Sequence, residues 1–124
     1  MNDSYLKEAK EKWGSTKAYA EFSEKAQNRS AADFQKINEN LNNIMGEFAA
    51  CMVRGLRPDA AETQSLVGKL QRYISEYYYT CSKDILFGLG QMYVADERFR
   101  KNIDRHADGT ALYIREAIKV YCGK

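Results

Sequence analysis

The sequence predicts an all-α fold: a single globin-like domain with about seven helices of unequal length in irregular packing. Proline occurs once in 124 residues, and no segment of strand length alternates apolar and polar residues. Apolar residues instead recur three and four positions apart, and residues typical of helix ends stand between these stretches. A chain of this length can bury a core of its own, so we expect residues 1–124 to form one domain.

Residues 1–30 carry few large apolar side chains among many charges. Gly14 follows Trp13 where a short first helix would end, and Ser15 can cap a second short helix. The large apolar side chains of this stretch are Tyr5, Leu6, Trp13, Tyr19 and Phe22. Two short helices with so little to bury are marginal on their own. We therefore expect residues 1–30 to be a mobile lid region and residues 31–124 to be the helical core.

A long helix is predicted directly after Ser30. Ser30 followed by Asp33 resembles a capping box, with Asp in the place of the usual Glu. Gly55 ends the helix shortly before the chain's one proline, Pro58. Between these ends one apolar seam recurs at helical spacing, formed by Phe34, Ile37, Leu41, Ile44, Phe48 and Cys51.

In the second half of the chain, apolar spacing and capping residues predict four further helices. An apolar stripe at helical spacing consists of Leu66, Leu70, Tyr73, Ile74, Tyr77 and Cys81. Ser82 can cap the next helix, and Asp96 can cap a short one after it. Residues 106–109, His-Ala-Asp-Gly, predict a turn. A last helix then carries Ile114, Ala117, Ile118 and Tyr121 on one face.

Charge, hydropathy and composition exclude several classes of protein. The net charge is +2, from 19 basic and 17 acidic residues, so this chain alone is not expected to bind nucleic acid. The mean hydropathy is −0.62, no long apolar run predicts a membrane span, and no apolar leader follows Met1. Three cysteines without a Cys-x-x-Cys pair are typical of reduced thiols, and we expect a cytoplasmic protein.

A single histidine, His106, limits the chemistry further. A zinc site would require all three distant cysteines to converge on it, and a Ser-His-Asp triad has no nearby nucleophile in the sequence. His106 is also the one candidate axial ligand for haem, but it stands in the predicted turn. We therefore expect no metal, no cofactor and no catalytic residue.

The three cysteines have different sequence contexts. Cys51 belongs to an apolar seam and is predicted to lie in the core, whereas Cys122 stands near the chain end. Cys81 directly precedes the helix start at Ser82, where backbone N–H groups can lower the pKa of a thiol. Cys81 also ends the apolar stripe, which favours an inert thiol in the core. The sequence pattern leaves both interpretations open.

Three consecutive tyrosines follow one another at positions 77, 78 and 79. On a helix they point about 100° apart, so they cannot all face one core. Tyr77 continues the apolar stripe, and Tyr78 and Tyr79 then face another helix or a cleft. They either pack between helices or form an aromatic wall for a flat ligand.

Several strings resemble the TipA-type antibiotic-recognition domain over nearly the whole chain. They are MYVADERF at residues 92–99, ISEYYYTCS at 74–82, EKWGST at 11–16 with Tyr19, and GTALY at 109–113. The resemblance implies a globin-like helical domain that binds bulky hydrophobic antibiotics in a cleft. It also implies that Cys81 can capture a thiopeptide covalently through a dehydroalanine of the drug. This chain differs from the family pattern at Lys69, Tyr73 and Lys83.

The expected ligand-binding residues combine the residue patterns with this resemblance: Cys81, Trp13, Tyr19, Phe22, Tyr78, Tyr79, Met92 and Tyr113. We expect a monomeric drug-binding module that sequesters or senses its ligand and is not an enzyme. The alternative is the effector domain of a MerR-type transcription activator, in which a separate part binds DNA.

Overall fold

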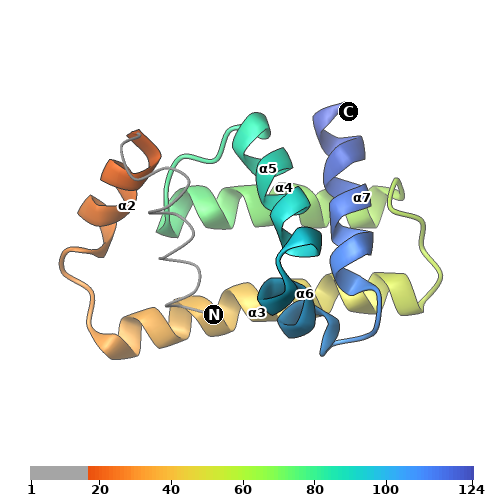
Figure 1. Ribbon diagram of the computed structural model, residues 1–124, viewed down its shortest axis with the longest axis horizontal. Coiled ribbons are helices and arrows are strands. Elements are labelled where there is room, and N and C mark those ends of the chain that lie inside the picture. Colours follow the sequence, from red (N-terminus) through yellow and green to blue (C-terminus); the bar gives the residue numbers. More distant parts are fainter. Residues whose placement is uncertain (1–16) are drawn as a thin grey trace.

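The computed structural model describes residues 17–124, and all regular structure in this range is α-helical. The helices are α2 (Lys17–Ala26), α3 (Ala31–Val53), α4 (Ala61–Tyr77), α5 (Lys83–Ala95), α6 (Glu97–Asp104) and α7 (Thr110–Cys122). The predicted all-α fold is thus confirmed. Helices α3 and α4 run in opposite directions along the molecule, and α5 and α7 cross them side by side (Figure 1).

The predicted start and end of the longest helix are confirmed. The Ser30 hydroxyl accepts the Asp33 N–H at 3.1 Å, and the Asp33 carboxylate accepts the Ser30 N–H at 3.0 Å. Helix α3 ends at Val53, and Gly55 follows with φ +83°, a left-handed conformation that suits glycine. The inward half of the predicted seam, from Leu41 onward, is buried.

Helix α4 ends earlier than the apolar stripe suggested. The stripe reached Cys81, but the helix stops at Tyr77, and Tyr78 is its C-cap. The Ile74 carbonyl accepts both the Tyr78 and the Tyr79 N–H groups, at 2.9 and 3.1 Å. Because the chain leaves the helix here, the helical geometry assumed for the three tyrosines does not apply beyond Tyr77.

Helices α5 and α7 share the most extensive helix–helix interface among the described residues. A Cβ atom at Gly90 would lie 3.1 Å from Ile118 Cδ1, so the missing side chain lets the two helices approach. The predicted caps of α5 and α6 are confirmed. Ser82 Oγ accepts the Ile85 N–H at 3.2 Å, and Asp96 Oδ1 accepts the Arg98 N–H at 2.9 Å.

Helix α2 has a smaller helix–helix interface than the other described helices. The extensive helix–helix interfaces within residues 17–124 all lie among α3, α4, α5, α6 and α7. Helix α2 lies at one end of the molecule, on the side of the α4–α5 connection (Figure 1). In the same described range, no helix is both long and apolar enough to cross a membrane.

Candidate functional site

The loop between α4 and α5 is the most deeply buried connection among the described helices. Tyr79 is fully buried, and Tyr78 and Cys81 are 5% and 4% exposed. Helix α4 fixes the loop through two side chains. Ser75 Oγ accepts the Cys81 N–H at 3.0 Å, and Gln71 Nε2 donates to the Cys81 carbonyl at 2.8 Å.

Helix α2 lies against this loop through two neighbouring residues. The Phe22 ring stacks on the Tyr78 ring, with centroids 5.8 Å apart and an interplanar angle of 10°. The Glu21 carboxylate accepts the Thr80 N–H at 3.2 Å and the Thr80 hydroxyl at 2.6 Å. On the other side the Tyr78 hydroxyl donates to Asn38 Oδ1 of α3 at 3.0 Å. Tyr78 therefore lies between α2 and α3.

Arg29 joins the link between α2 and α3 to the end of α4. Its Nη1 donates to the Tyr77 carbonyl at 2.6 Å. The guanidinium carbon also lies 5.8 Å from the centroid of the Tyr77 ring and 6.0 Å from that of Phe34. These contacts use a carbonyl near the C-terminus of α4, where a cation is favoured.

Of the two interpretations that the sequence leaves open for Cys81, this arrangement favours the buried thiol and not the thiol with a lowered pKa. Burial raises the pKa of the thiol to about 12, and nearby Cys122 adds to the shift. The sulfur lies 3.8 Å from the carbonyl of Ser82, to which it can only donate. Loss of hydration therefore outweighs the helix N-terminus, and the closed thiol is a poor nucleophile.

The pKa values of the two other thiols are raised as well. Cys51 is 3% exposed, as predicted for a core residue. Its Sγ donates to Glu62 Oε2 at 3.4 Å, and burial together with this carboxylate raises its pKa. Cys122 Sγ donates to the Lys83 carbonyl at 3.4 Å, and burial raises its pKa as well.

The structure brings some of the predicted ligand-binding residues together and separates others. Phe22 of α2 stacks on Tyr78 of the α4–α5 loop, and Tyr79 and Cys81 of the same loop belong to the same buried core cluster. Trp13 lies outside the described residues. Tyr19 belongs to α2, but its side chain lies outside the description.

Met92 belongs to the same core cluster, whereas the Tyr113 hydroxyl has different surroundings. Met92 is buried on α5. The Tyr113 hydroxyl lies 2.9 Å from Thr63 Oγ1 and donates to the Leu56 carbonyl at 2.9 Å. Tyr113 thereby fastens α7 to the turn between α3 and α4, which lies at the opposite end of α4 from the Tyr78 loop (Figure 1).

Tyr93 of α5 belongs to the same region and was not among the predicted site residues. It is fully buried, and its hydroxyl interacts electrostatically with Tyr79, Cys81 and Tyr78. Its position next to Met92 in the MYVADERF string was the one signal in the sequence. We call Phe22, Tyr78, Tyr79, Cys81 and Tyr93 the Tyr78 cluster.

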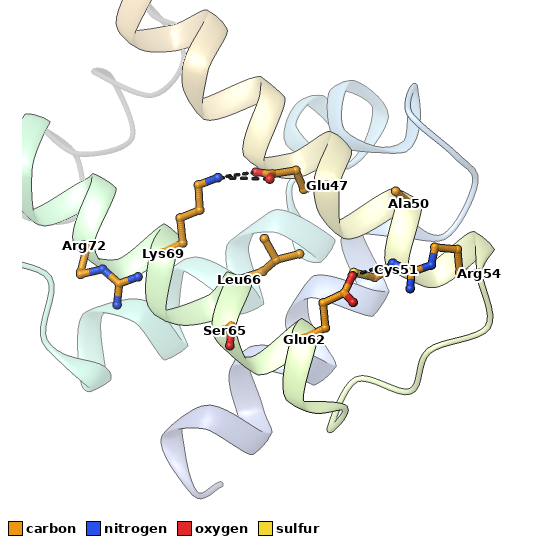
Figure 2. A pocket seen from close by; sticks show the side chains of 9 residues that line it. All are labelled: Glu47, Ala50, Cys51, Arg54, Glu62, Ser65, Leu66, Lys69 and Arg72. Carbon is orange, nitrogen blue, oxygen red and sulfur yellow. Dashed lines mark hydrogen bonds and ion pairs between the residues drawn. The ribbon is translucent and has the colours of Figure 1, made fainter.

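A separate groove of about 450 Å³ lies between α3 and α4 (Figure 2). Ion pairs join Lys69 to Glu47 at 2.9 Å and Arg54 to Glu62 at 2.6 Å across it. The groove is lined by Glu47, Ala50, Cys51, Arg54, Glu62, Ser65, Leu66, Lys69 and Arg72. It contains none of the expected ligand-binding residues. Exposed ion pairs of this kind are worth little energetically and show no chemistry of their own.

A polar pocket of about 250 Å³ lies nearer to the Tyr78 cluster, between α3 and the end of α6. It is lined by Asn38, Asn42, Asn102, Arg105 and His106. Asn38 belongs to both the pocket and the surroundings of the cluster, because its Oδ1 accepts a hydrogen bond from the Tyr78 hydroxyl. Over the described part of the chain, no group of three or more His, Cys, Asp or Glu residues is placed to hold a metal ion.

The chain is similar to known proteins over nearly its whole length. The family model of the TipAS antibiotic-recognition domain matches residues 5–121. The HTH-type transcriptional activator mta of Bacillus subtilis is 39% identical over 120 residues, and the HTH-type transcriptional activator TipA of Streptomyces coelicolor is 34% identical over 116. These matches cover 96% and 94% of this chain but 45% and 46% of the relatives, so the chain spans about half their length.

A solved structure is similar as well. It holds TipAS in complex with nosiheptide and is described as part of a thiopeptide antibiotic multidrug resistance system from Streptomyces lividans. The match covers 99% of this chain and 86% of that chain, with a TM-score of 0.83 and 32% sequence identity.

Proposed function

The chain belongs to the TipAS antibiotic-recognition domain family, and we propose from this premise that it binds a bulky, largely hydrophobic antibiotic of the thiopeptide class. The observation that carries the proposal is the likeness to TipAS in complex with nosiheptide, with a TM-score of 0.83 over 99% of this chain. The protein acts by stoichiometric binding rather than turnover, as a cytoplasmic monomer. Trp13, Tyr19 and the Tyr78 cluster supply the ligand-binding residues.

The Tyr78 cluster is the binding site in this proposal, and α2 has to move to open it. One feature supports a movable α2: within residues 17–124 it takes no part in the extensive helix–helix interfaces. Exposing a phenylalanine costs about 1.5–3 kcal/mol, and each of the two hydrogen bonds that the Glu21 carboxylate accepts from Thr80 is worth about 1.5–3 kcal/mol. A ligand that buries a few hundred Å² of apolar surface, at about 25 cal/mol per Å², offsets a cost of this size.

Residues 1–30 act as the lid in this account. Phe22 and Glu21 touch the loop that carries Tyr78 and Cys81, so the lid and the site share residues. Ligand binding replaces the Phe22–Tyr78 stack with contacts to the drug. The lid then closes over the ligand, and binding energy meets the cost of ordering it.

Covalent capture by Cys81 follows the opening step. In the closed arrangement burial holds the thiol pKa at about 12, so few thiolates exist near neutral pH. Once exposed beside the N-terminus of α5, the thiolate adds to the β-carbon of a dehydroalanine. The C–S bond forms, the C=C π bond breaks, and the α-carbon takes up a proton in place of the one the thiol lost. The adduct has the summed mass of protein and drug.

A second candidate function is the effector domain of a transcription activator. It is favoured because the chain matches about half of each HTH-type activator, 45% and 46% of their lengths. In such a protein the closing of the lid over the drug would be the signal passed to the DNA-binding part. The chain's net charge of +2 supports a DNA contact outside these residues.

Calorimetric titration with nosiheptide and other thiopeptides tests the proposal. The Cys81→Ser variant isolates reversible binding, because it removes the thiol and leaves the apolar surface of the cluster intact. We expect one drug molecule per chain and a negative heat-capacity change from apolar burial. A Cys81→Ser protein that is folded and shows neither heat nor a change in Trp13 fluorescence with any of these drugs would refute the proposed function.

A further inference from the structure

One buried hydroxyl lacks a hydrogen bond. Within residues 17–124, Tyr93 Oη is the one buried side-chain nitrogen or oxygen without a hydrogen-bond partner. Other inward tyrosines are satisfied: Tyr78 donates to Asn38, and Tyr113 donates to the Leu56 carbonyl. Leaving such a group unpaired lowers the stability of the folded state. Phenylalanine would fill the same space without this cost, so the hydroxyl requires an explanation other than packing.

The position of the hydroxyl is as informative as its lack of a partner. Tyr79, Cys81 and Tyr78 are the groups that act on it electrostatically, and all three belong to the loop covered by α2. Its own helix, α5, packs closely on α7, with Gly90 against Ile118. In the proposed function α2 is the segment that opens. Tyr93 lies next to the loop that α2 contacts, on α5, which is fixed against α7. Groups held in this way are suited to orient a ligand.

We propose that Tyr93 is a ligand-anchoring residue, whose hydroxyl donates a hydrogen bond to an acceptor on the bound drug. This inference rests on the proposed function and adds a specificity determinant to the same site. The acceptor is an amide carbonyl or an azole nitrogen, the groups that a modified peptide presents. In a cleft of aromatic rings, one placed hydrogen bond fixes the orientation of the ligand.

The protonation state of Tyr93 agrees with this role. Burial, with the neighbouring Tyr79, Cys81 and Tyr78, raises the pKa of its phenol well above the ordinary value of 10.0. The group is therefore neutral and able to donate at any physiological pH. A drug analogue in which the acceptor is replaced by a methylene group leaves the hydroxyl unpaired again, so the site discriminates against it.

The test compares two tyrosine-to-phenylalanine variants in the Cys81→Ser background, which reports reversible binding alone. Tyr93→Phe removes the unpaired hydroxyl. Tyr73→Phe is the matched control, because the Tyr73 hydroxyl donates to the Ile37 carbonyl at 2.7 Å, between α3 and α4. Urea unfolding without ligand and the Kd for nosiheptide are measured for each protein.

We expect Tyr93→Phe to keep or raise the urea midpoint and to weaken nosiheptide binding about tenfold, the effect of one hydrogen bond. Tyr73→Phe should lower the midpoint and leave Kd unchanged. The inference is overturned if Tyr93→Phe binds within twofold of its background, or if it loses stability as Tyr73→Phe does. If the background protein binds no thiopeptide, the proposed function itself fails, which is a separate result.

Discussion

The rings of Phe22 and Tyr78 stack with centroids 5.8 Å apart and an interplanar angle of 10°. This contact joins a helix outside the main interfaces to a loop that is otherwise fixed on the core. In the proposed function, this contact separates the lid that opens for a drug from the part of the molecule that stays in place. The Tyr78 hydroxyl donates a hydrogen bond to Asn38 of α3. This bond fixes the Tyr78 ring on α3.

Phe22→Ala should make Cys81 more accessible at a smaller cost in stability than truncation of a phenylalanine in the interfaces among α3 to α7. Truncating a core phenylalanine typically costs about 3–5 kcal/mol, but α2 takes no part in the extensive interfaces of the described helices. Phe22 is itself buried, so we expect a loss of about 1.5–3 kcal/mol in the free energy of unfolding, below that of a central core residue, and faster alkylation of Cys81 in the ligand-free protein.

Phe87→Ala is the control for this comparison, because Phe87 lies half-buried on α5, beneath the Lys124 ammonium. It should leave the alkylation rate of Cys81 unchanged. Equal rates in wild type and Phe22→Ala would show that α2 does not cover the thiol.

The pH dependence of stability should report the buried Cys81 thiol. Burial raises its pKa to about 12, whereas an unfolded cysteine titrates near 8.5. Between about pH 9 and 11 the unfolded chain therefore loses a proton that the folded chain keeps, and stability falls as pH rises. Wild type should lose more stability than Cys81→Ser over this range, by up to about 1.4 kcal/mol per pH unit. Urea midpoints that fall in parallel for the two proteins would contradict the burial of the thiol.

Amide hydrogen exchange should be faster in α2 than in the helical core. Without ligand we expect the amides of α2 to exchange much faster than those of α3 near Phe48, because local opening there breaks few apolar contacts. With nosiheptide bound, the protection of α2 should rise. Protection of α2 equal to that of α3 in the free protein would refute the lid.

Trp13 is expected to close on the ligand, and it lies outside the described residues. Trp13→Ala should weaken drug binding by about 1–3 kcal/mol, as aromatic anchors do, with little change in the melting temperature. Normal binding by Trp13→Ala would show that this tryptophan is not part of the site. A large fall in the melting temperature would place it in the core instead.

The features that the sequence predicted well are local. The caps formed by Ser30, Ser82 and Asp96 depend on residues two or three positions away, and all three are present. The seam that ends in Cys51 follows from helical spacing alone, and its inner half is buried.

The features that could not be predicted depend on contacts between distant segments. The environment of Cys81 depends on the end of α4 at Tyr77 and on burial by packed segments, which decide between the two interpretations that the sequence left open and raise the pKa of the thiol. Tyr113 was among the expected ligand-binding residues, yet its hydroxyl donates to the Leu56 carbonyl in the turn between α3 and α4. The unpaired hydroxyl of Tyr93 follows only from the three-dimensional packing.

Intact mass measurement of the protein after incubation with nosiheptide, followed by peptide mapping, tests the central claim most directly. The account predicts a mass increase equal to that of one drug molecule, carried by the peptide that contains Cys81, and its loss in Cys81→Ser with reversible binding retained. Cys51→Ser should behave as wild type. An adduct on Cys51 or Cys122, or a wild-type protein that neither binds the drug reversibly nor gains its mass, would contradict the account.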